Sequence, residues 1–127
     1  MKLLFENWRD TSWETDGEHV ALSDVIEHLS VQEAVDINAL ELSQQLLHLT
    51  GRDFTGCLKA ERVEAASLKY PIIVVKNGGQ YRFILDGNHR LQKAINEEVE
   101  NIKARILDID SPETPEVFKK MFGADPR

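Results

Sequence analysis

The chain lacks several features that would assign it to a specialised class of protein. It has a single cysteine, Cys57, so no internal disulfide can form, and no Cys/His cluster has the spacing of a zinc site. No apolar run approaches the roughly 20 residues needed to cross a bilayer. Residues 1–8 have too short an apolar stretch for a signal peptide and no small-residue cleavage site. We therefore expect a cytoplasmic protein without a membrane segment.

Basic charge is also scarce. The 127 residues include 15 lysines and arginines against 22 acidic residues, which gives a net charge of −7. Because binding along the DNA backbone needs a basic face, direct DNA binding is not expected. A local basic pocket and a basic protein partner both stay compatible with this charge. The 42% of apolar residues is typical of a globular domain with one core.

The chain shows no internal repeat and no long linker, so we expect one domain. Residues 1–17 carry Trp8 and Trp13 among polar residues, which predicts an N-terminal arm that packs these rings on the domain or binds a partner. Residues 18–109 form the predicted core. Residues 110–127 have proline pairs typical of helix starts and then a C-terminal helix. Its apolar residues are Val117, Phe118 and Met121.

The first half of the core predicts a short strand and several helices. Residues 19–22 read as a strand, and Ser-Asp at the start of 23–29 would cap a helical turn. Residues 38–50 have leucines at helical spacing after an asparagine cap, and a glycine follows them. Residues 61–68 have helical composition. They belong to the most basic stretch of the chain, 52–69.

The clearest pattern lies in the second half of the chain. A β-branched run at 71–75 predicts a buried strand, Asn-Gly-Gly at 77–79 predicts a hairpin turn, and the alternating residues 80–85 predict the return strand. A helix begins near Asn88, and a last strand covers 101–109. The residues expected on the buried helix face are Leu91, Ala94, Ile95 and Val99. Because such a crossover favours parallel pairing, we expect a compact α+β fold with a mixed sheet.

The run Asp-Gly-Asn-His-Arg at 86–90 joins the return strand to the helix and is the best candidate for a site. Gly87 has no side chain, so a ligand could approach the backbone closely. The first helical turn presents unpaired N–H groups at the positive end of its dipole. Arg90 adds a fork suited to phosphate oxygens, Asn88 and His89 are further donors, and histidine can move a proton near neutral pH. The pattern predicts an anion site, with the phosphates of a nucleotide as the favoured ligand.

Simpler interpretations of these residues stay open. Asp-Gly is a common turn, asparagine is a common cap, and His-Arg could begin a solvated helix. Asp86 could pair with Arg90 or cap the turn. As a functional group it would be a general base, a magnesium ligand or a contact to a sugar hydroxyl. Asp108 and Asp110 share one face at the end of a strand, where they could hold magnesium or form a solvated turn.

The predicted hairpin leads to a Gly-x-x-Arg box at the start of a helix, and an alanine follows four residues after the arginine. The residues are Gly87, Arg90 and Ala94. In these residues the chain resembles the ParB/sulfiredoxin superfamily. The positions that also match the sulfiredoxin pattern are Gly78, Gly79, Tyr81, Phe83, Gly87, His89 and Arg90. The box is similar to the Asp-Gly-Gln-His-Arg box of DndB-like proteins of DNA modification loci. The resemblance covers about residues 70–109 and implies a compact α/β fold with a nucleotide-phosphate pocket at the box.

The chain also departs from these families. Asn88 stands where sulfiredoxins have a cysteine, so thiol-based repair of peroxiredoxin is not implied, and Cys57 lies far away in sequence. His89 stands where the ParB box usually has a second arginine. A chain of 127 residues has no room for the helix-turn-helix and dimerisation domains of ParB proteins. We therefore expect a stand-alone nucleotide-pocket domain.

The resemblance implies ligands and roles. Some members bind and hydrolyse CTP and others are ADP-dependent kinases, so a nucleoside di- or triphosphate (CTP, ATP or ADP) with Mg²⁺ is implied. The catalytic candidates are Asp86 and His89, and the phosphate-binding candidates are Gly87, Asn88, His89, Arg90 and Lys69. The N-terminal part of the domain completes such pockets. The other candidates there are Thr55, Lys59, Arg62 and Ser67.

Three functions stay open at this point. The first is a nucleotide-binding domain that acts as a small NTPase or phosphotransferase. The second is a non-catalytic module, as in small proteins of phages and mobile elements, that binds a protein partner or a second copy of itself. The third is an accessory role linked to DNA, which the net charge of −7 disfavours. An enzyme would show turnover, a switch would self-associate with nucleotide, and an interaction module would show neither.

Overall fold

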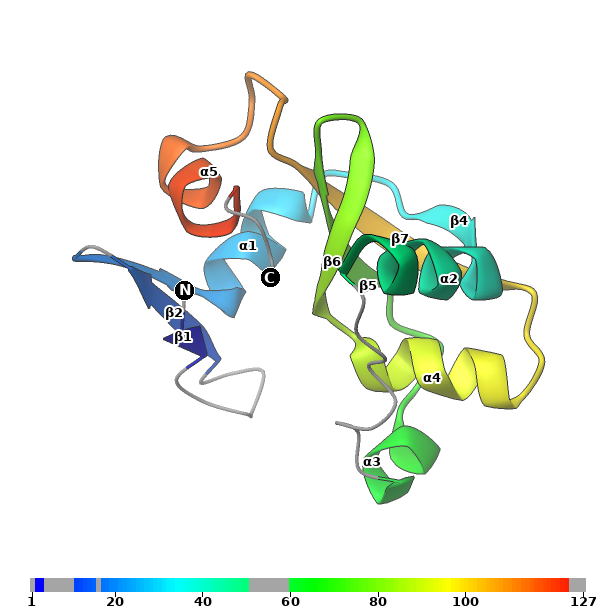
Figure 1. Cartoon of the computed structure of the whole chain (residues 1–127). Coiled ribbons are helices and arrows are strands. Elements are labelled where there is room, and N and C mark those ends of the chain that lie inside the picture. The colour runs from blue at the N-terminus through cyan, green and yellow to red at the C-terminus, as the bar shows by residue number, and fades with distance from the viewer. Residues whose placement is uncertain (1, 4–10, 16, 51–59, 124–127) are drawn as a thin grey trace.

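The computed structural model describes residues 2–3, 11–15, 17–50 and 60–123, whose arrangement is shown in Figure 1. A four-stranded mixed sheet lies at the centre, with helices on both of its faces. In spatial order its strands are β4 (Val35–Asn38), β7 (Asn101–Asp108), β5 (Ile72–Asn77) and β6 (Gln80–Asp86). The predicted α+β fold with a mixed sheet is confirmed.

Strands β5 and β6 form the predicted antiparallel hairpin. All four residues of Ile72–Val75 are buried, because β5 has a neighbouring strand on each side and helices over both faces. The turn places Gly78 at φ 64° and Gly79 at φ 78°, a region that glycine adopts without strain. The N–H of Gly78 donates to Oδ2 of Asp110 at 2.7 Å. The Asn-Gly-Gly prediction is thus confirmed, and a distant carboxylate supports the turn.

Helix α4 (Asn88–Asn96) connects β6 to β7. Strand β7 pairs parallel with β5 and not with β6, so the favoured parallel pairing occurs with the first strand of the hairpin and not with the strand that leads into the helix. The helix buries Leu91 and Ala94, as predicted, and half-buries Ile95. The expectation that Val99 continues the apolar face is wrong. The helix ends at Asn96, and Val99 is 37% exposed.

Alternate residues of β5 contribute to two cores on opposite faces of the sheet. Ile72 and Val74 pack with α2 (Ala39–Thr50) and α4, whereas Ile73 and Val75 pack with α1 (Leu22–Leu29) and α5 (Glu116–Phe122). Figure 1 shows the two pairs of helices on either side of the sheet. Each fully buried aliphatic side chain contributes about 1.5–3 kcal/mol. The hairpin is therefore fixed from both faces, and its end, where the site lies, is fixed with it.

Strand β4 was not predicted. It pairs antiparallel with β7. The side chain of Gln32, which precedes β4, bonds to the backbone of β7 further along that strand. The Gln32 Nε2 donates to the carbonyl of Ile106 at 3.0 Å, and the N–H of Ile106 donates to Gln32 Oε1 at 2.6 Å. The strand is short and its residues are exposed or half-buried, so no apolar alternation marks it. The predicted cap of α2 is confirmed, because the N–H of Glu41 donates to Oδ1 of Asn38 at 2.9 Å.

A second, antiparallel sheet lies at the N-terminus. Its strands are β1 (Lys2–Leu3), β2 (Ser12–Thr15) and β3 (Glu18–Ala21). The hairpin of β2 and β3 turns at Gly17, so it crosses the boundary between arm and core that the sequence suggested. Trp13 is 4% exposed and meets the ring of Phe122 edge-on at 5.2 Å, which confirms that it packs on the domain. Trp8 lies outside the described residues.

The remaining helices differ from prediction mainly at their ends. Helix α1 begins at Leu22, and the N–H of Ala21 donates to Oδ2 of Asp24 at 3.1 Å. Helix α3 (Ala60–Ala65) is shorter than the predicted 61–68. Helix α5 buries Phe118 and Met121, as the C-terminal helix was expected to do. Among the described helices, none is long and apolar enough to span a bilayer.

Candidate functional site

A pocket of about 740 Å³ opens beside the start of α4, on the face of the sheet that α1 covers. Its walls come from α1, from α3 and the segment that joins it to β5, from the ends of β5 and β6, from the first turn of α4, and from β7. The lining residues are Ile26, Leu29, Arg62, Ala66, Ser67, Tyr70, Pro71, Ile73, Asp86, Gly87, His89, Arg90 and Arg105. The predicted junction at 86–90 therefore lies on a pocket wall, with side chains from both halves of the core around it.

Gly87 is required here for a different reason from the one the sequence suggested. It precedes α4 with φ 106° and ψ 21°, a left-handed conformation. A Cβ at this position would lie 2.9 Å from Cβ of Ile72 and would overlap with the side chain of that residue. The missing side chain thus lets β5 pack against the junction. It fixes where α4 starts, so packing against Ile72 and the left-handed backbone account for the glycine.

Arg90 is anchored by one of its terminal nitrogens. Nη1 donates to the carbonyl of Pro71 at 2.9 Å and lies 3.4 Å from Oδ2 of Asp86. The guanidinium carbon is 5.9 Å from the centroid of the Tyr70 ring, a cation–π distance. Within the described part of the chain, Nη2 and Nε of Arg90 have no acceptor. The arginine is therefore held in place while part of its fork stays available to a ligand.

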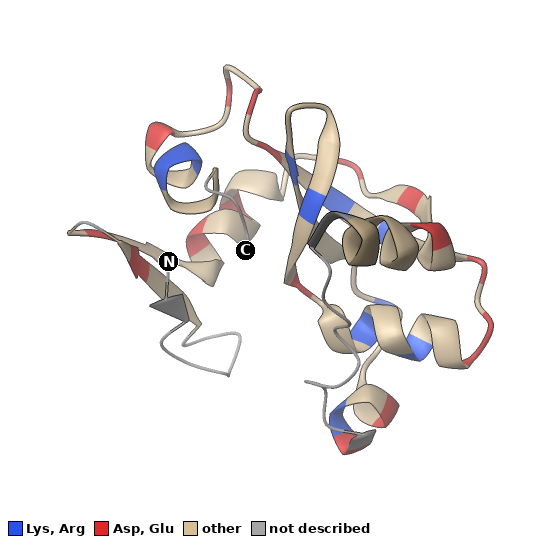
Figure 2. Ribbon diagram, viewed as in Figure 1, with Lys and Arg blue, Asp and Glu red and all other residues tan. Residues whose placement is uncertain are grey.

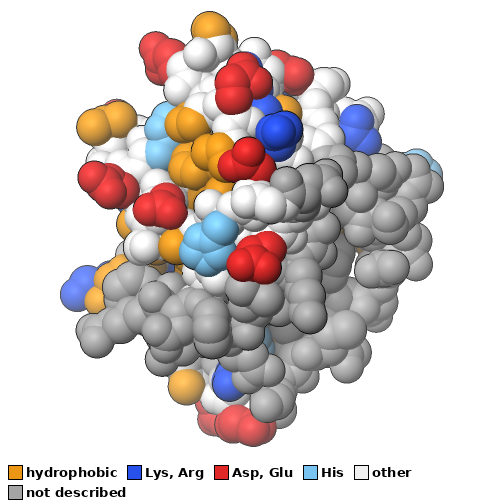
Figure 3. All heavy atoms as spheres, turned by 90° about the vertical axis from the view of Figure 1, so that its left-hand side faces the viewer, with side chains coloured by type: hydrophobic (Ala, Val, Ile, Leu, Met, Phe, Trp, Pro, Cys, Tyr) orange, Lys and Arg blue, Asp and Glu red, His pale blue; other side chains and the backbone are white. Residues whose placement is uncertain are grey.

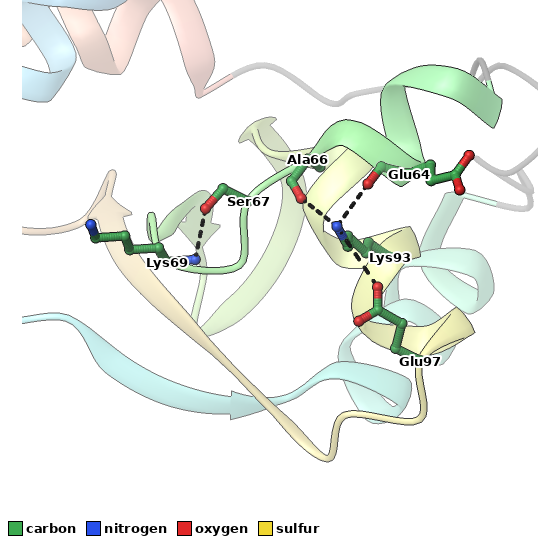
Figure 4. A network of polar contacts seen from close by, with 6 residues as sticks. All are labelled: Glu64, Ala66, Ser67, Lys69, Lys93 and Glu97. Carbon is green, nitrogen blue, oxygen red and sulfur yellow. Dashed lines mark hydrogen bonds and ion pairs between the residues drawn. The ribbon is translucent and has the colours of Figure 1, made fainter.

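The predicted site residues fall into two groups. Asp86, Gly87, His89 and Arg90 all line the pocket. Asn88 is the first residue of α4 but is not part of the lining. Lys69 does not line the pocket either. Its side chain is exposed and its backbone N–H donates to Oγ of Ser67 at 3.3 Å, and Figure 4 shows its ammonium group pointing away from α4.

The segment that carries Arg62 and Ser67 is tied to α4 by Lys93. The Lys93 Nζ donates to the carbonyls of Glu64 and Ala66, both at 2.7 Å, and lies 3.8 Å from the Glu97 carboxylate (Figure 4). A lysine at the last carbonyls of a helix also complements its dipole, here that of α3. Two of the further candidates, Arg62 and Ser67, are thereby brought to the pocket. Thr55, Cys57 and Lys59 lie outside the described residues.

Arg105 is the site residue that the sequence analysis missed. It lies on β7 directly across from Ile73, in the middle of the sheet, and it lines the pocket. Its Nε is buried and has no hydrogen-bond partner within the described part of the chain. Leu107 on β7 and Ile109 just beyond it continue the same face and are buried. A charged residue beside these apolar positions was the available signal, because a buried polar group needs a hydrogen-bond partner.

The pocket is a basic site on an acidic protein. Among the described residues, the guanidinium groups of Arg62, Arg90 and Arg105 and the ring of His89 line it, together with one carboxylate, that of Asp86. Figure 2 shows basic positions on the strands of the central sheet and on α4, and acidic positions on many of the surrounding loops. An excess of positive charge in the lining of a pocket attracts an anion of matching size.

A metal site built from protein side chains alone is not found in the described residues, where no group of three His, Cys, Asp or Glu side chains converges. Asp108 and Asp110 instead support the turns at the end of β7. Oδ1 of Asp108 accepts the N–H of Asp110 at 3.0 Å, and Asp110 accepts that of Gly78. Of the two interpretations given for these carboxylates, the structure favours the turn.

Comparisons with protein-family models, with curated proteins and with solved structures gave no match to this chain. The resemblance to the ParB/sulfiredoxin superfamily therefore stays a prediction that depends on the residues at 78–94. The case for an anion site in this pocket does not depend on that resemblance, because it follows from the lining by Arg62, Arg90 and Arg105.

Proposed function

We propose that this pocket binds the phosphate groups of a nucleoside di- or triphosphate such as CTP, ATP or ADP. The observation that carries the proposal is the convergence of Arg62, Arg90 and Arg105 on one pocket at the start of a helix. Guanidinium groups are permanently charged and match the geometry of phosphate oxygens. Three of them in one pocket of a chain with net charge −7 indicate a specific anionic ligand.

Two further features support a phosphate ligand. The residue before α4 is a glycine, which has no side chain to cap the first N–H groups of the helix, and such groups bind phosphate oxygens well. The buried Nε of Arg105 has no acceptor among the described residues, and a phosphate oxygen would supply one.

Phosphoryl transfer or hydrolysis is a second candidate, because Asp86 and His89 line the same pocket. A histidine side chain can serve as a proton acceptor or donor in catalysis. Mg²⁺ commonly binds through phosphates and one or two carboxylates, and Asp86 is the carboxylate that fits this role. Phosphate release from ATP or CTP by the wild type, lost in His89→Asn without loss of binding, would establish the activity. Binding without release would favour the non-catalytic module.

The binding proposal is tested by comparing Arg105→Met with Lys103→Met. Lys103 lies on the same strand, and its exposed ammonium pairs with Asp36 at 2.8 Å outside the pocket. The unfolding temperature of each protein is measured alone and with CTP, ATP, ADP or GTP and Mg²⁺. For the wild type, a ligand at 100 times its Kd stabilises the fold by about 2.7 kcal/mol.

We expect Lys103→Met to keep that stabilisation and Arg105→Met to lose it. Without ligand, Arg105→Met should be as stable as the wild type or more stable by about 1 kcal/mol, because it removes a buried group without a partner. A stable variant that no longer responds to nucleotide separates loss of the site from loss of the fold. No stabilisation of the wild type by any nucleotide would refute the proposal.

A further inference from the structure

Tyr70 is an exposed aromatic residue on the wall of the phosphate pocket. It is 57% exposed, although large aromatic side chains are commonly buried. Its position is fixed by its neighbours. Its N–H lies 3.5 Å from the carbonyl of Ser67, and the next residue, Pro71, accepts a hydrogen bond from Arg90. An aromatic residue at a pocket wall, with its backbone anchored and more than half of its surface in solvent, offers a surface to a ligand.

The ring lies next to the group that would hold the phosphates. The guanidinium carbon of Arg90 is 5.9 Å from the ring centroid. In a nucleotide a single ribose separates the base from its first phosphate, so one molecule can contact both an arginine and an aromatic ring at this separation. Stacking on an aromatic side chain is a general means of binding bases, because every base has a π face.

We propose that Tyr70 is the stacking surface for the base of the bound nucleotide, so that the pocket selects nucleoside polyphosphates over inorganic polyphosphates. This inference rests on the proposed function of the same pocket. The apolar part of the lining, Ile26, Leu29 and Ile73, supports it, because a purely inorganic anion would make no use of such a wall.

The inference is tested with two kinds of probe. Dissociation constants are measured by calorimetry for inorganic tripolyphosphate and for the tightest-binding nucleotide among CTP, ATP and GTP. The proteins are the wild type, Tyr70→Ala and Tyr70→Phe. Tyr70→Phe keeps the ring and serves as the matched control, and circular dichroism verifies that each variant is folded.

We expect Tyr70→Ala to weaken nucleotide binding about tenfold or more and to leave tripolyphosphate binding unchanged, since stacking acts only on the base. Tyr70→Phe should bind nucleotide nearly as well as the wild type. Equal weakening of both probes by Tyr70→Ala would show that the ring only supports Arg90, and would overturn the inference. So would an unchanged nucleotide affinity. If tripolyphosphate and all the nucleotides fail to bind the wild type, the proposed function itself fails.

Discussion

Gly87 is constrained both by its own backbone and by the strand beside it. Its φ of 106° disfavours any residue with a Cβ, and Ile72 occupies the space that a Cβ would need. Gly79 is a useful comparison. Its φ is 78°, but nothing lies within 4 Å of the Cβ that it lacks. The two glycines therefore separate the cost of the backbone conformation from the cost of overpacking.

We predict that Gly87→Ala destabilises the fold by about 2–4 kcal/mol and Gly79→Ala by about 1 kcal/mol. The difference between the two is the cost of forcing Ile72 away from the junction. Urea denaturation of both variants measures these values. Equal destabilisation would contradict the account, since it would mean that β5 can move away from Gly87 at no cost.

At the scale of single residues, the sequence identified the junction at 86–90 but not its environment. Asp86, His89 and Arg90 could be selected because their spacing and residue types form a local pattern. Arg105 was missed although it interrupts an apolar run, because its place on the pocket depends on which face of β7 lies toward α1. Lys69 was chosen for its place in a basic stretch, yet the chain turns between Ser67 and Tyr70 and its side chain points outward.

At the scale of secondary-structure elements, the C-terminal end of α4 has a backbone conformation in which glycine is usually found. The N–H of Val99 donates to the carbonyl of Ala94 at 2.8 Å, and that of Glu98 to the carbonyl of Ile95 at 3.1 Å. This is a Schellman motif, in which the residue after the cap has positive φ. Here that residue is Glu98, with φ 56°, the only positive-φ residue other than glycine in the described chain.

Glu98→Gly should therefore stabilise the protein, by about 0.5–1 kcal/mol, because glycine adopts this conformation without strain. Glu98→Ala is the control, since it removes the same charge and keeps the strain. The unfolding temperatures of the two variants and the wild type are compared. Stabilisation of the same size in Glu98→Ala would show that the charge, and not the backbone, is responsible.

The elements that the sequence predicted well are those specified by local patterns. The β5–β6 hairpin follows from a β-branched run and Asn-Gly-Gly, and α4 follows from apolar residues at helical spacing. Strand β4 was not predicted, because its four residues have partly exposed side chains and carry no such pattern. The strand forms by pairing with β7. The extent of α4 was overestimated for a similar reason, since its end is set by backbone hydrogen bonds at Glu98 and Val99.

At the scale of the whole molecule, the charge of the pocket lining is opposite to the net charge of the chain. The chain is acidic, and on the described part of the face shown in Figure 3 acidic side chains are scattered while basic ones form no continuous surface. The pocket, in contrast, collects Arg62, Arg90 and Arg105 from three separate parts of the sequence. Such a distribution suits a small anion that enters a pocket.

The measurement that tests the central claim most directly is a titration of ¹⁵N-labelled protein with CTP, ATP and ADP in the presence of Mg²⁺, followed by NMR. The account predicts saturable shifts in the Nε–H signals of Arg62, Arg90 and Arg105 and in the backbone amides of 87–90 for at least one nucleotide. The backbone amide of Lys103, which lies outside the pocket lining, should stay nearly unchanged. Spectra that do not change with any of the three nucleotides, or shifts confined to residues away from this pocket, would contradict the account.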